Sequence, residues 1–345
     1  MHPFSSRFLL TLSALSAAVA LHGWDAPGHR IVNQLALDSL PADFPAFVRE
    51  PAAVGRIAFL AGEPDRWSHA LDLPLKHDSW PEHYLDVEEL ADAGLDARAV
   101  SSLRYDFVAA FTAGRAAHPE NFQHADALNV VYHTDKLPGL LPWVVTEYYG
   151  RLKAAFSSLQ VYQELGTPEE IANAQADVIY TMGIMGHFVG DLFQPLHTSV
   201  HHDGWVGPNP HGYFTGKFFH SWIDSGLIAK ARITVADLAP RVVPAEPLPT
   251  AAREDGRDPV FVTVMDSLLE QNKLVEPLYQ LEKAGKLGRG EAPVAPEGRA
   301  LIENQLHQGG ELLGALWLTA WKSAPPEEFL RKQLLKRQAA AAAAK

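Results

Sequence analysis

Histidine and aspartate side chains are concentrated in one segment of this chain. The segment HFVGDLFQPLHTSVHHDGWVGPNPHGYFTGKFFHSWID holds six of the sixteen histidines. His187 and His220 are each followed four residues later by an aspartate, Asp191 and Asp224, and His197 closes the first pattern. Residues at i and i+4 lie one above the other on a helix, with Cβ atoms roughly 5–6 Å apart. An imidazole and a carboxylate of one helix would therefore reach the same cation, and such ligands without a thiolate suit zinc.

A purely structural role is the alternative for the first pair. His187 and Asp191 lie in the stretch YTMGIMGHFVGDLF, which has almost no other polar group. Burying both unpaired would cost on the order of several kcal/mol, and a hydrogen bond between them would avoid that cost without a metal. This alternative does not explain His197 or the second pair, so the pattern favours a metal site.

Composition limits the classes of function. The chain has 345 residues, is 47% hydrophobic, carries a net charge of −12 and has no cysteine. Its size allows one large domain or two ordinary ones. The absence of cysteine excludes disulfides, thiolate zinc sites and cysteine nucleophiles. The negative charge does not favour general attraction to polyanions, so binding of nucleic acid or lipid phosphate would need a local positive centre such as metal ions.

The N-terminus has the pattern of a signal peptide. Arg7 precedes the apolar run FLLTLSALSAAVAL, which is too short to span a bilayer comfortably. We predict that residues 1–23 are a signal peptide and that the mature protein is secreted or periplasmic, without stable membrane insertion. A cut after Gly23 would make Trp24 the first residue, whereas the A-x-A pattern ending at Ala20 indicates another cut. An amphipathic or membrane-anchoring helix is the alternative.

Helical spacing dominates the remaining sequence. A long helix is predicted over 168–193, with Thr167 as N-cap and Pro168 at the first helical position. Four other helices are predicted: one after residue 28, one that includes 152–159, one over 219–231 and one over 300–320. A further helix should start near Asp258, and Pro277 should kink or end it. Loops are expected at 74–81, 201–213 and 240–249. The prediction is one all-α domain over 24–325, with a low-complexity tail at 326–345.

Three glycines in the long helix are unusual. Gly183, Gly186 and Gly190 would each cost about 1 kcal/mol relative to alanine in a helix. Their spacing places them on one face, which predicts that something bulky packs closely against the helix backbone.

Further metal-ligand residues lie upstream, and the full order resembles a known family. Trp24 and His29 give W-x4-H, and Asp65 and His83 follow before the segment described above. The order W-x4-H, D, H-[FY]-x-D, H-x3-D-x5-H and H-x3-D resembles the zinc-dependent single-strand-specific nucleases of the plant and fungal trinuclear-zinc type. That family is related to bacterial zinc-dependent phospholipase C. The resemblance spans nearly the whole mature chain, and its most specific part is HFVGDLFQPLH followed by FHSWID.

The resemblance implies a secreted, single-domain, all-α fold of the phospholipase C/nuclease type, with three zinc ions in a cleft. It implies these ligands: Asp65, His83, His187 and Asp191 for one zinc; His197, His220 and Asp224 for the second; Trp24, through its free amino group and carbonyl oxygen, with His29 and a shared Asp191, for the third. We also expect Asp65 to orient the attacking water. Signal cleavage before Trp24 would then be part of forming the site.

The resemblance also implies substrate-binding residues. Tyr84 and Asp86 match positions that stack on a nucleobase and hydrogen-bond to it. Asn209 lies in a Gly-Pro-Asn-Pro segment that replaces the family's Gly-Gly-Asn. The arginine expected three residues after the first aspartate is Ser68, with Arg66 nearby. His201, His202 and His211 have no matched role.

The expected function is hydrolysis of single-stranded DNA, RNA or nucleotides by a zinc-activated water, as an endonuclease with a further expectation of 3′-nucleotidase activity. Three zinc ions against three ligand carboxylates would leave local positive charge for phosphate. One alternative is a zinc-dependent phospholipase C, with a phospholipid as substrate. Another is a non-catalytic, exported, zinc-binding helical protein. The protein is expected to be a monomer.

Overall fold

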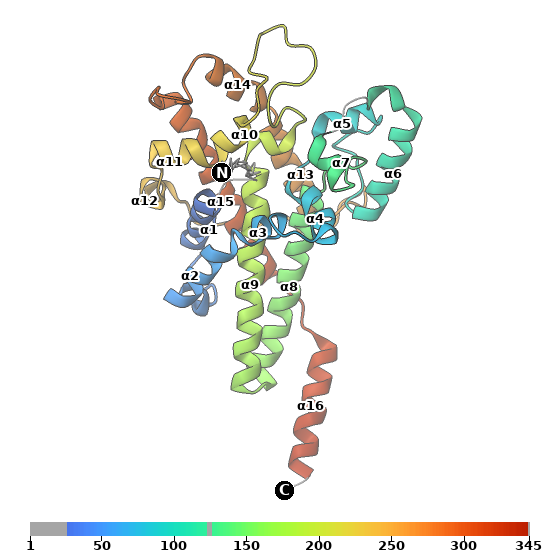
Figure 1. The fold of residues 1–345 in the computed structure, drawn as a ribbon. Helices are drawn as coiled ribbons and strands as arrows, with labels where there is room; N and C mark the ends of the chain where they lie inside the picture. Colours follow the sequence, from blue (N-terminus) through green and yellow to red (C-terminus); the bar gives the residue numbers. More distant parts are fainter. Residues whose placement is uncertain (1–25, 123–125, 344–345) are drawn as a thin grey trace, which may run out of the picture.

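The structure is a computed structural model that describes residues 26–122 and 126–343, and it is all-α (Figure 1). The described residues form no strand, and Leu85 and Gly139 make an isolated antiparallel bridge. The α-helices are α1 (Ala26–Ser39), α2 (Pro51–Leu60), α3 (Glu63–Ser68), α4 (Leu73–Ser79), α5 (Val87–Asp92), α6 (Arg104–Ala117), α7 (Ala127–Val131), α8 (Leu141–Leu165), α9 (Pro168–Leu192), α10 (Phe219–Ser221), α11 (Ile228–Ala231), α12 (Val235–Leu238), α13 (Pro259–Asn272), α14 (Val275–Lys283), α15 (Pro296–Lys322) and α16 (Glu328–Ala343). Short 3-10 turns are η1 (Ala46–Arg49), η2 (Trp80–His83), η3 (Pro119–Asn121), η4 (Pro195–Thr198) and η6 (Ala239–Arg241), and η5 (Trp222–Leu227) is a π-helix.

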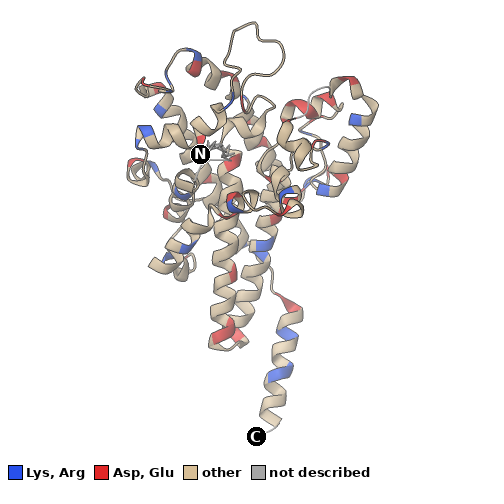
Figure 2. Ribbon diagram, in the orientation of Figure 1, with Lys and Arg blue, Asp and Glu red and all other residues tan. Residues whose placement is uncertain are grey.

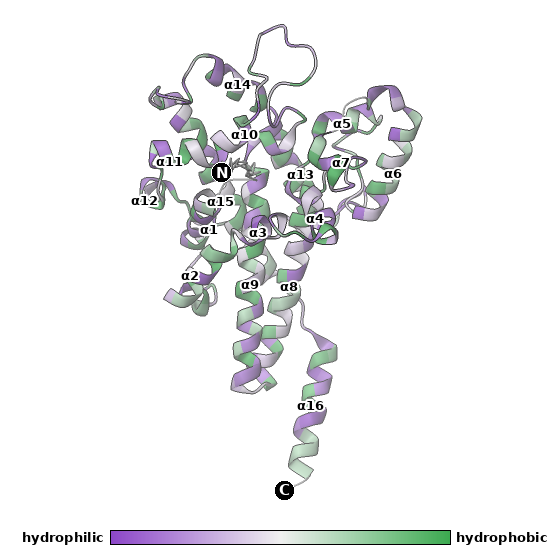
Figure 3. Ribbon diagram, in the orientation of Figure 1, coloured by the Kyte–Doolittle hydropathy of each residue, from purple (hydrophilic) through white to green (hydrophobic). Residues whose placement is uncertain are grey.

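A hairpin of the two long helices α8 and α9 forms the centre of the molecule (Figure 1). Helices α1, α2 and α15 pack against its upper part, and α1 also packs along α15. The buried apolar side chains of these helices belong to one continuous core. Figure 3 shows hydrophobic residues along the upper part of α9 and more hydrophilic ones toward its lower tip. The core therefore surrounds the end of α9 that carries the histidine–aspartate pair.

Local signals at the start of α9 agree with the prediction. Thr167 caps the helix by accepting a hydrogen bond from the Glu170 backbone N–H, and the Glu170 side chain accepts from the Thr167 N–H. Pro168 occupies the first turn, where no intrahelical donor is needed. The observed helix, Pro168–Leu192, matches the predicted range to within one residue.

The glycine face of α9 confirms the predicted close approach. A Cβ added to Gly183 would lie 2.5 Å from the Leu60 Cβ, and one added to Gly190 would lie 2.4 Å from the His29 Nδ1. At Gly186 it would lie 1.6 Å from the Asn33 Oδ1. These separations are shorter than a normal contact, so alanine does not fit at any of the three positions without rearrangement. The bulky neighbours are α1 and the end of α2.

Two local predictions were wrong. Residues 74–81 are helical rather than a loop, because Asp72 caps α4 and proline is tolerated in a first turn. The helix that starts at Pro259 ends at Asn272 and not at Pro277, which lies in the first turn of α14. The helices predicted over 219–231 and 300–320 are present as α10–η5–α11 and within α15.

The remaining elements lie on either side of the hairpin. Helices α5, α6 and α7 form a group on one side of its upper end, α11 and α12 lie on the other, and α10 lies near the top of α9 (Figure 1). Helix α16 forms much of the predicted tail and lies along the lower end of α8. Acidic residues mark the lower tip of the hairpin in Figure 2. None of the described helices has both the length and the apolar composition that a membrane crossing requires.

Candidate metal centre

Three groups of histidine and aspartate side chains meet at the upper end of α9, and each could hold a metal ion. Within each group the ligand atoms all lie within 4.8 Å of one another. The groups are His29, His187 and Asp191; Asp65, His83 and His187; and His197, His220 and Asp224. These side chains come from α1, α3, η2, α9, η4, α10 and η5. Segments that are distant in the sequence thus converge on one buried place.

Asp191 lies where the first two groups meet. Its Oδ2 is 3.0 Å from the His83 Nδ1 and 3.2 Å from the His187 Nε2. Its Oδ1 is 3.4 Å from the His29 Nε2. The two oxygens of one carboxylate therefore face different imidazoles. This arrangement suits a carboxylate that bridges two cations.

Asp65 lies at the edge of the same cluster, on α3. Its Oδ1 is 3.7 Å from the His187 Nε2, so two carboxylates face one imidazole nitrogen. Electron-rich atoms that converge in this way are favourable only around a positive charge.

Two members of the third group, His220 and Asp224, lie on successive turns after residue 218, and His197 comes from η4. His220 Nε2 is 2.9 Å from the Asp224 Oδ2 and also 2.9 Å from the His197 Nε2. Gln194 donates to the Asp224 Oδ1 at 2.7 Å and so orients that carboxylate. Asp224 lies in the π-helix η5, and π-helical turns are frequent at functional sites.

Backbone carbonyls fix the orientation of two imidazoles. His187 Nδ1 donates to the Ala61 carbonyl at 2.7 Å, and His197 Nδ1 donates to the His83 carbonyl at 2.6 Å. A histidine that donates through one ring nitrogen presents the other toward the cluster. Metal-binding histidines typically have such an outer partner, which sets the tautomer and the ring orientation.

The electrostatics of the cluster keep most of its imidazoles neutral. Burial lowers the pKa of His83 and of His220 to about 4, and it also lowers the pKa of His29 and His197. For His187, burial opposes the charged form, but the carboxylates of Asp191 and Asp65 outweigh it and raise the pKa to about 9. Neutral imidazole is the form that binds metal.

The donor set fits zinc. Both ring nitrogens of the fully buried His29 lack a hydrogen-bond partner among residues 26–122 and 126–343. A buried imidazole without such partners is costly unless another atom binds it. Imidazole and carboxylate ligands without thiolate suit zinc, and they leave positions for water.

The cluster reaches solvent at two of its members. The side chains of Asp65 and His220 are 12% and 16% exposed, whereas those of His83 and His197 are 3% exposed. His29, His187 and Asp191 are fully buried. Solvent therefore reaches the cluster from the side of Asp65 and His220.

Tyr84 and Asp86 lie one and three residues after His83, and backbone hydrogen bonds hold this segment in place. The N–H of Leu85 donates to the His197 carbonyl at 2.9 Å, and the N–H of Asp86 donates to the Pro138 carbonyl at 2.7 Å. Burial raises the pKa of the Asp86 carboxyl and of the Tyr84 hydroxyl. Both predicted substrate residues thus adjoin the metal groups through the backbone.

Two other predicted site residues are not found in the cluster as the structure describes it. The Asn209 side chain donates to the Tyr213 carbonyl and accepts from its N–H, so it orders its own loop. Trp24 lies outside the described residues. Every other predicted metal ligand is in one of the three groups.

Sequence reasoning missed three residues beside the cluster. Gln194 lies in the string QPLH between Asp191 and His197, but no function was predicted for it. His202 and Asp126 form an ion pair at 3.7 Å, and the His202 ring centroid is 6.1 Å from that of His220. No local signal links His202 and Asp126, because the pair depends on the tertiary fold.

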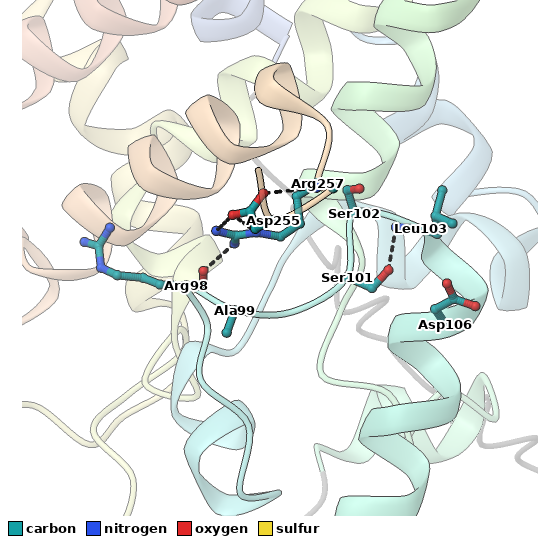
Figure 4. Close-up of a pocket in the computed structure, with 9 residues that line it drawn as sticks. Arg98, Ala99, Ser101, Ser102, Leu103, Asp106, Asp255 and Arg257 are labelled. Carbon is teal, nitrogen blue, oxygen red and sulfur yellow. Dashed lines mark hydrogen bonds and ion pairs between the residues drawn. The ribbon is translucent and has the colours of Figure 1, made fainter. Parts of the chain in front are cut away.

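A separate surface cavity of about 490 Å³ lies between the start of α6 and the loop before α13 (Figure 4). Three of its charged side chains are already engaged: Arg257 with Asp255, and Arg98 with Asp266. None of the residues that line it belongs to a metal group.

Comparison with models of protein families and with curated proteins finds no match to this chain.

Proposed function

We propose that this protein is a zinc-dependent phosphodiester hydrolase of the trinuclear-zinc nuclease type, acting on single-stranded nucleic acid. The observation that carries the proposal is the convergence of three histidine–aspartate groups at the buried end of α9. Two of these groups meet at Asp191. A purely structural histidine–aspartate pair would not require side chains from seven elements to meet.

The three aspartates of this site would have different roles in hydrolysis. Bound zinc would supply positive charge for the substrate phosphate and would lower the pKa of a coordinated water. Asp65 is the ligand carboxylate with measurable exposure, so it is placed to orient a water that enters from solvent. Asp191 and Asp224 are fully buried and would bind metal only.

The substrate class rests on Tyr84 and Asp86. The Tyr84 ring is half-buried, and an aromatic ring next to a phosphate site favours unpaired bases that stack on it. A buried carboxyl such as that of Asp86 would hydrogen-bond to the edge of a base. A phosphatidylcholine headgroup has no aromatic edge for this pair to bind.

The third zinc would depend on processing of the N-terminus. His29 on α1 is ready to bind a metal through a ring nitrogen, and Trp24 would complete the site only if its amino group were free. We therefore also propose export with cleavage after Gly23.

The test is to purify the exported protein after expression of the full chain, sequence its N-terminus, and assay single-stranded DNA, RNA and phosphatidylcholine side by side. We expect hydrolysis of the nucleic acids, its loss on zinc removal and its recovery when zinc is returned. Hydrolysis of phosphatidylcholine alone would replace the nuclease proposal by the phospholipase alternative. Full activity in zinc-free protein would contradict the proposed mechanism, and a mature start at Leu21 would contradict the role of Trp24.

A further inference from the structure

The loop after η4 brings His202 next to the metal centre, although His202 belongs to none of the three metal groups. Its ring centroid is 6.1 Å from that of His220, with the two rings at 73°. His220 is one of the two partly exposed members of the cluster, and the His202 side chain is 30% exposed. His202 therefore stands on the side from which a substrate would enter.

Asp126 pairs with the His202 imidazole and orients it. The His202 Nε2 is 3.7 Å from the Asp126 Oδ2. The same carboxylate caps α7 by accepting from the N–H groups of Leu128 and Asn129, so it is fixed by its own helix. With Nε2 directed at Asp126, the other ring nitrogen, Nδ1, lies on a different edge of the ring.

The arginine nearest in sequence to the first aspartate ligand is engaged elsewhere. Arg66 donates twice to Glu63, at 2.9 and 2.5 Å, and once to the Phe59 carbonyl at 3.0 Å. Its guanidinium also lies over the Phe59 ring, 4.2 Å from the centroid. Ser68, where the resemblance expects arginine, is buried against His83. Neither residue is arranged to supply a cation to a phosphate at this centre.

His202 also lies near both the metal centre and Asp86 of the predicted base site. It interacts electrostatically with Asp86 as well as with His220. A substrate with its phosphate at the metal groups and its base at Tyr84 and Asp86 would pass this side chain. We propose that His202, oriented by Asp126, binds a phosphate oxygen of the substrate beside the metal centre. This inference rests on the proposed function, because it assumes a phosphate-bearing substrate.

The experiment measures binding of inorganic phosphate to the zinc-loaded full chain by calorimetry, together with zinc content by metal analysis. H202Q keeps a donor for Asp126 but removes the donor at the Nδ1 position, so we expect phosphate affinity to fall about tenfold. H202N keeps a donor near that position, and we expect its affinity to stay within about threefold of wild type. H211Q, at an exposed histidine of the same loop, is the matched control and should bind phosphate as wild type does.

A second variant separates orientation from folding. D126N keeps the size of the side chain but removes its charge, and we expect phosphate affinity to fall about threefold, with zinc content unchanged. If H202Q and D126N both bind phosphate with wild-type affinity, the inference is wrong. If H202Q loses zinc in proportion to phosphate, His202 acts through the metal ligands, and the inference is also wrong.

The outcomes distinguish this inference from the proposed function. A chain that binds phosphate in a His202-dependent way but hydrolyses no nucleic acid would contradict the function and retain the inference. A chain that hydrolyses single-stranded DNA with equal KM and equal phosphate affinity in wild type and H202Q would contradict the inference alone.

Discussion

The two ends of α9 are stabilised in different ways. The first end lies at the exposed tip of the hairpin, where Thr167 caps it and Glu170 pairs with Arg337 of α16. The other end is buried from Thr181 to Leu192 and carries His187 and Asp191. About 35 Å separates the two ends along the helix axis.

The comparison shows that local interactions stabilise one end of α9, whereas tertiary packing stabilises the end that carries the candidate metal ligands. At the exposed end, a few neighbouring residues satisfy the helix backbone, and water would replace them at small cost. At the buried end, glycines let α1 and α2 approach the backbone, and polar ligands are brought into an apolar core. Stability at that end depends on tertiary fit, and the ligands need a cation to be favourable there.

The largest effect is expected from a change at the buried end. D191N removes the carboxylate whose oxygens face imidazoles of two metal groups, His29 and His83, so we expect loss of bound zinc and a fall in phosphodiesterase activity of about a thousandfold or more. D177N, on an exposed face of the same helix, is the matched control and should leave both unchanged. Wild-type zinc content and activity in D191N would contradict the shared role of this residue.

A smaller effect is expected from packing at the same end. In G183A the new methyl group would lie 2.5 Å from the Leu60 Cβ, so we expect the free energy of unfolding to fall by about 1–3 kcal/mol. Gly150 on α8 has no neighbour within 4 Å, and G150A should raise stability by about 1 kcal/mol. Denaturant unfolding of both variants measures the contrast. Equal free energies of unfolding for G183A and G150A would show that Leu60 does not pack tightly against Gly183.

At the exposed end, T167A removes the cap of α9. We expect a loss of about 1 kcal/mol in denaturant unfolding. Zinc content should not change, because the cap lies at the other end of the helix. Loss of zinc in T167A would show that the two ends are coupled.

The smallest effect is expected for the link between α16 and the tip of α9. The hydrogen bond from Arg337 lowers the pKa of Glu170 to about 2, from an ordinary value of 4.5. A lowered carboxyl pKa stabilises the fold above the unfolded value and ceases to do so as the pH falls through the folded value. Wild type should therefore be slightly more stable than R337Q above pH 4.5, and the difference in thermal unfolding should shrink between pH 4.5 and 2. A difference that grows with acid would contradict the pairing.

The sequence was sufficient for features with local signals. The cap at Thr167, the range of α9 and the close packing on its glycines followed from spacing and residue type. The residues of the three metal groups were also named from the sequence, because the order of motifs is distinctive.

Features that depend on the tertiary fold were not accessible in this way. His202 and Asp126 are 76 residues apart and meet only when the loop after η4 lies against α7. Helix α4 was missed because the prolines at 74 and 81 suggested a loop, although Asp72 caps the helix and a first turn accepts proline. Asn209 follows a family position in the sequence, but its amide binds the backbone of its own loop.

The most direct test of the metal centre is native mass spectrometry of the exported, processed full chain after equilibration with zinc. Convergence of the three groups predicts three zinc ions per chain, with the third dependent on a mature N-terminus at Trp24. A chain that retains no zinc under these conditions would contradict the account, because the buried histidines and aspartates would then be held by hydrogen bonds alone.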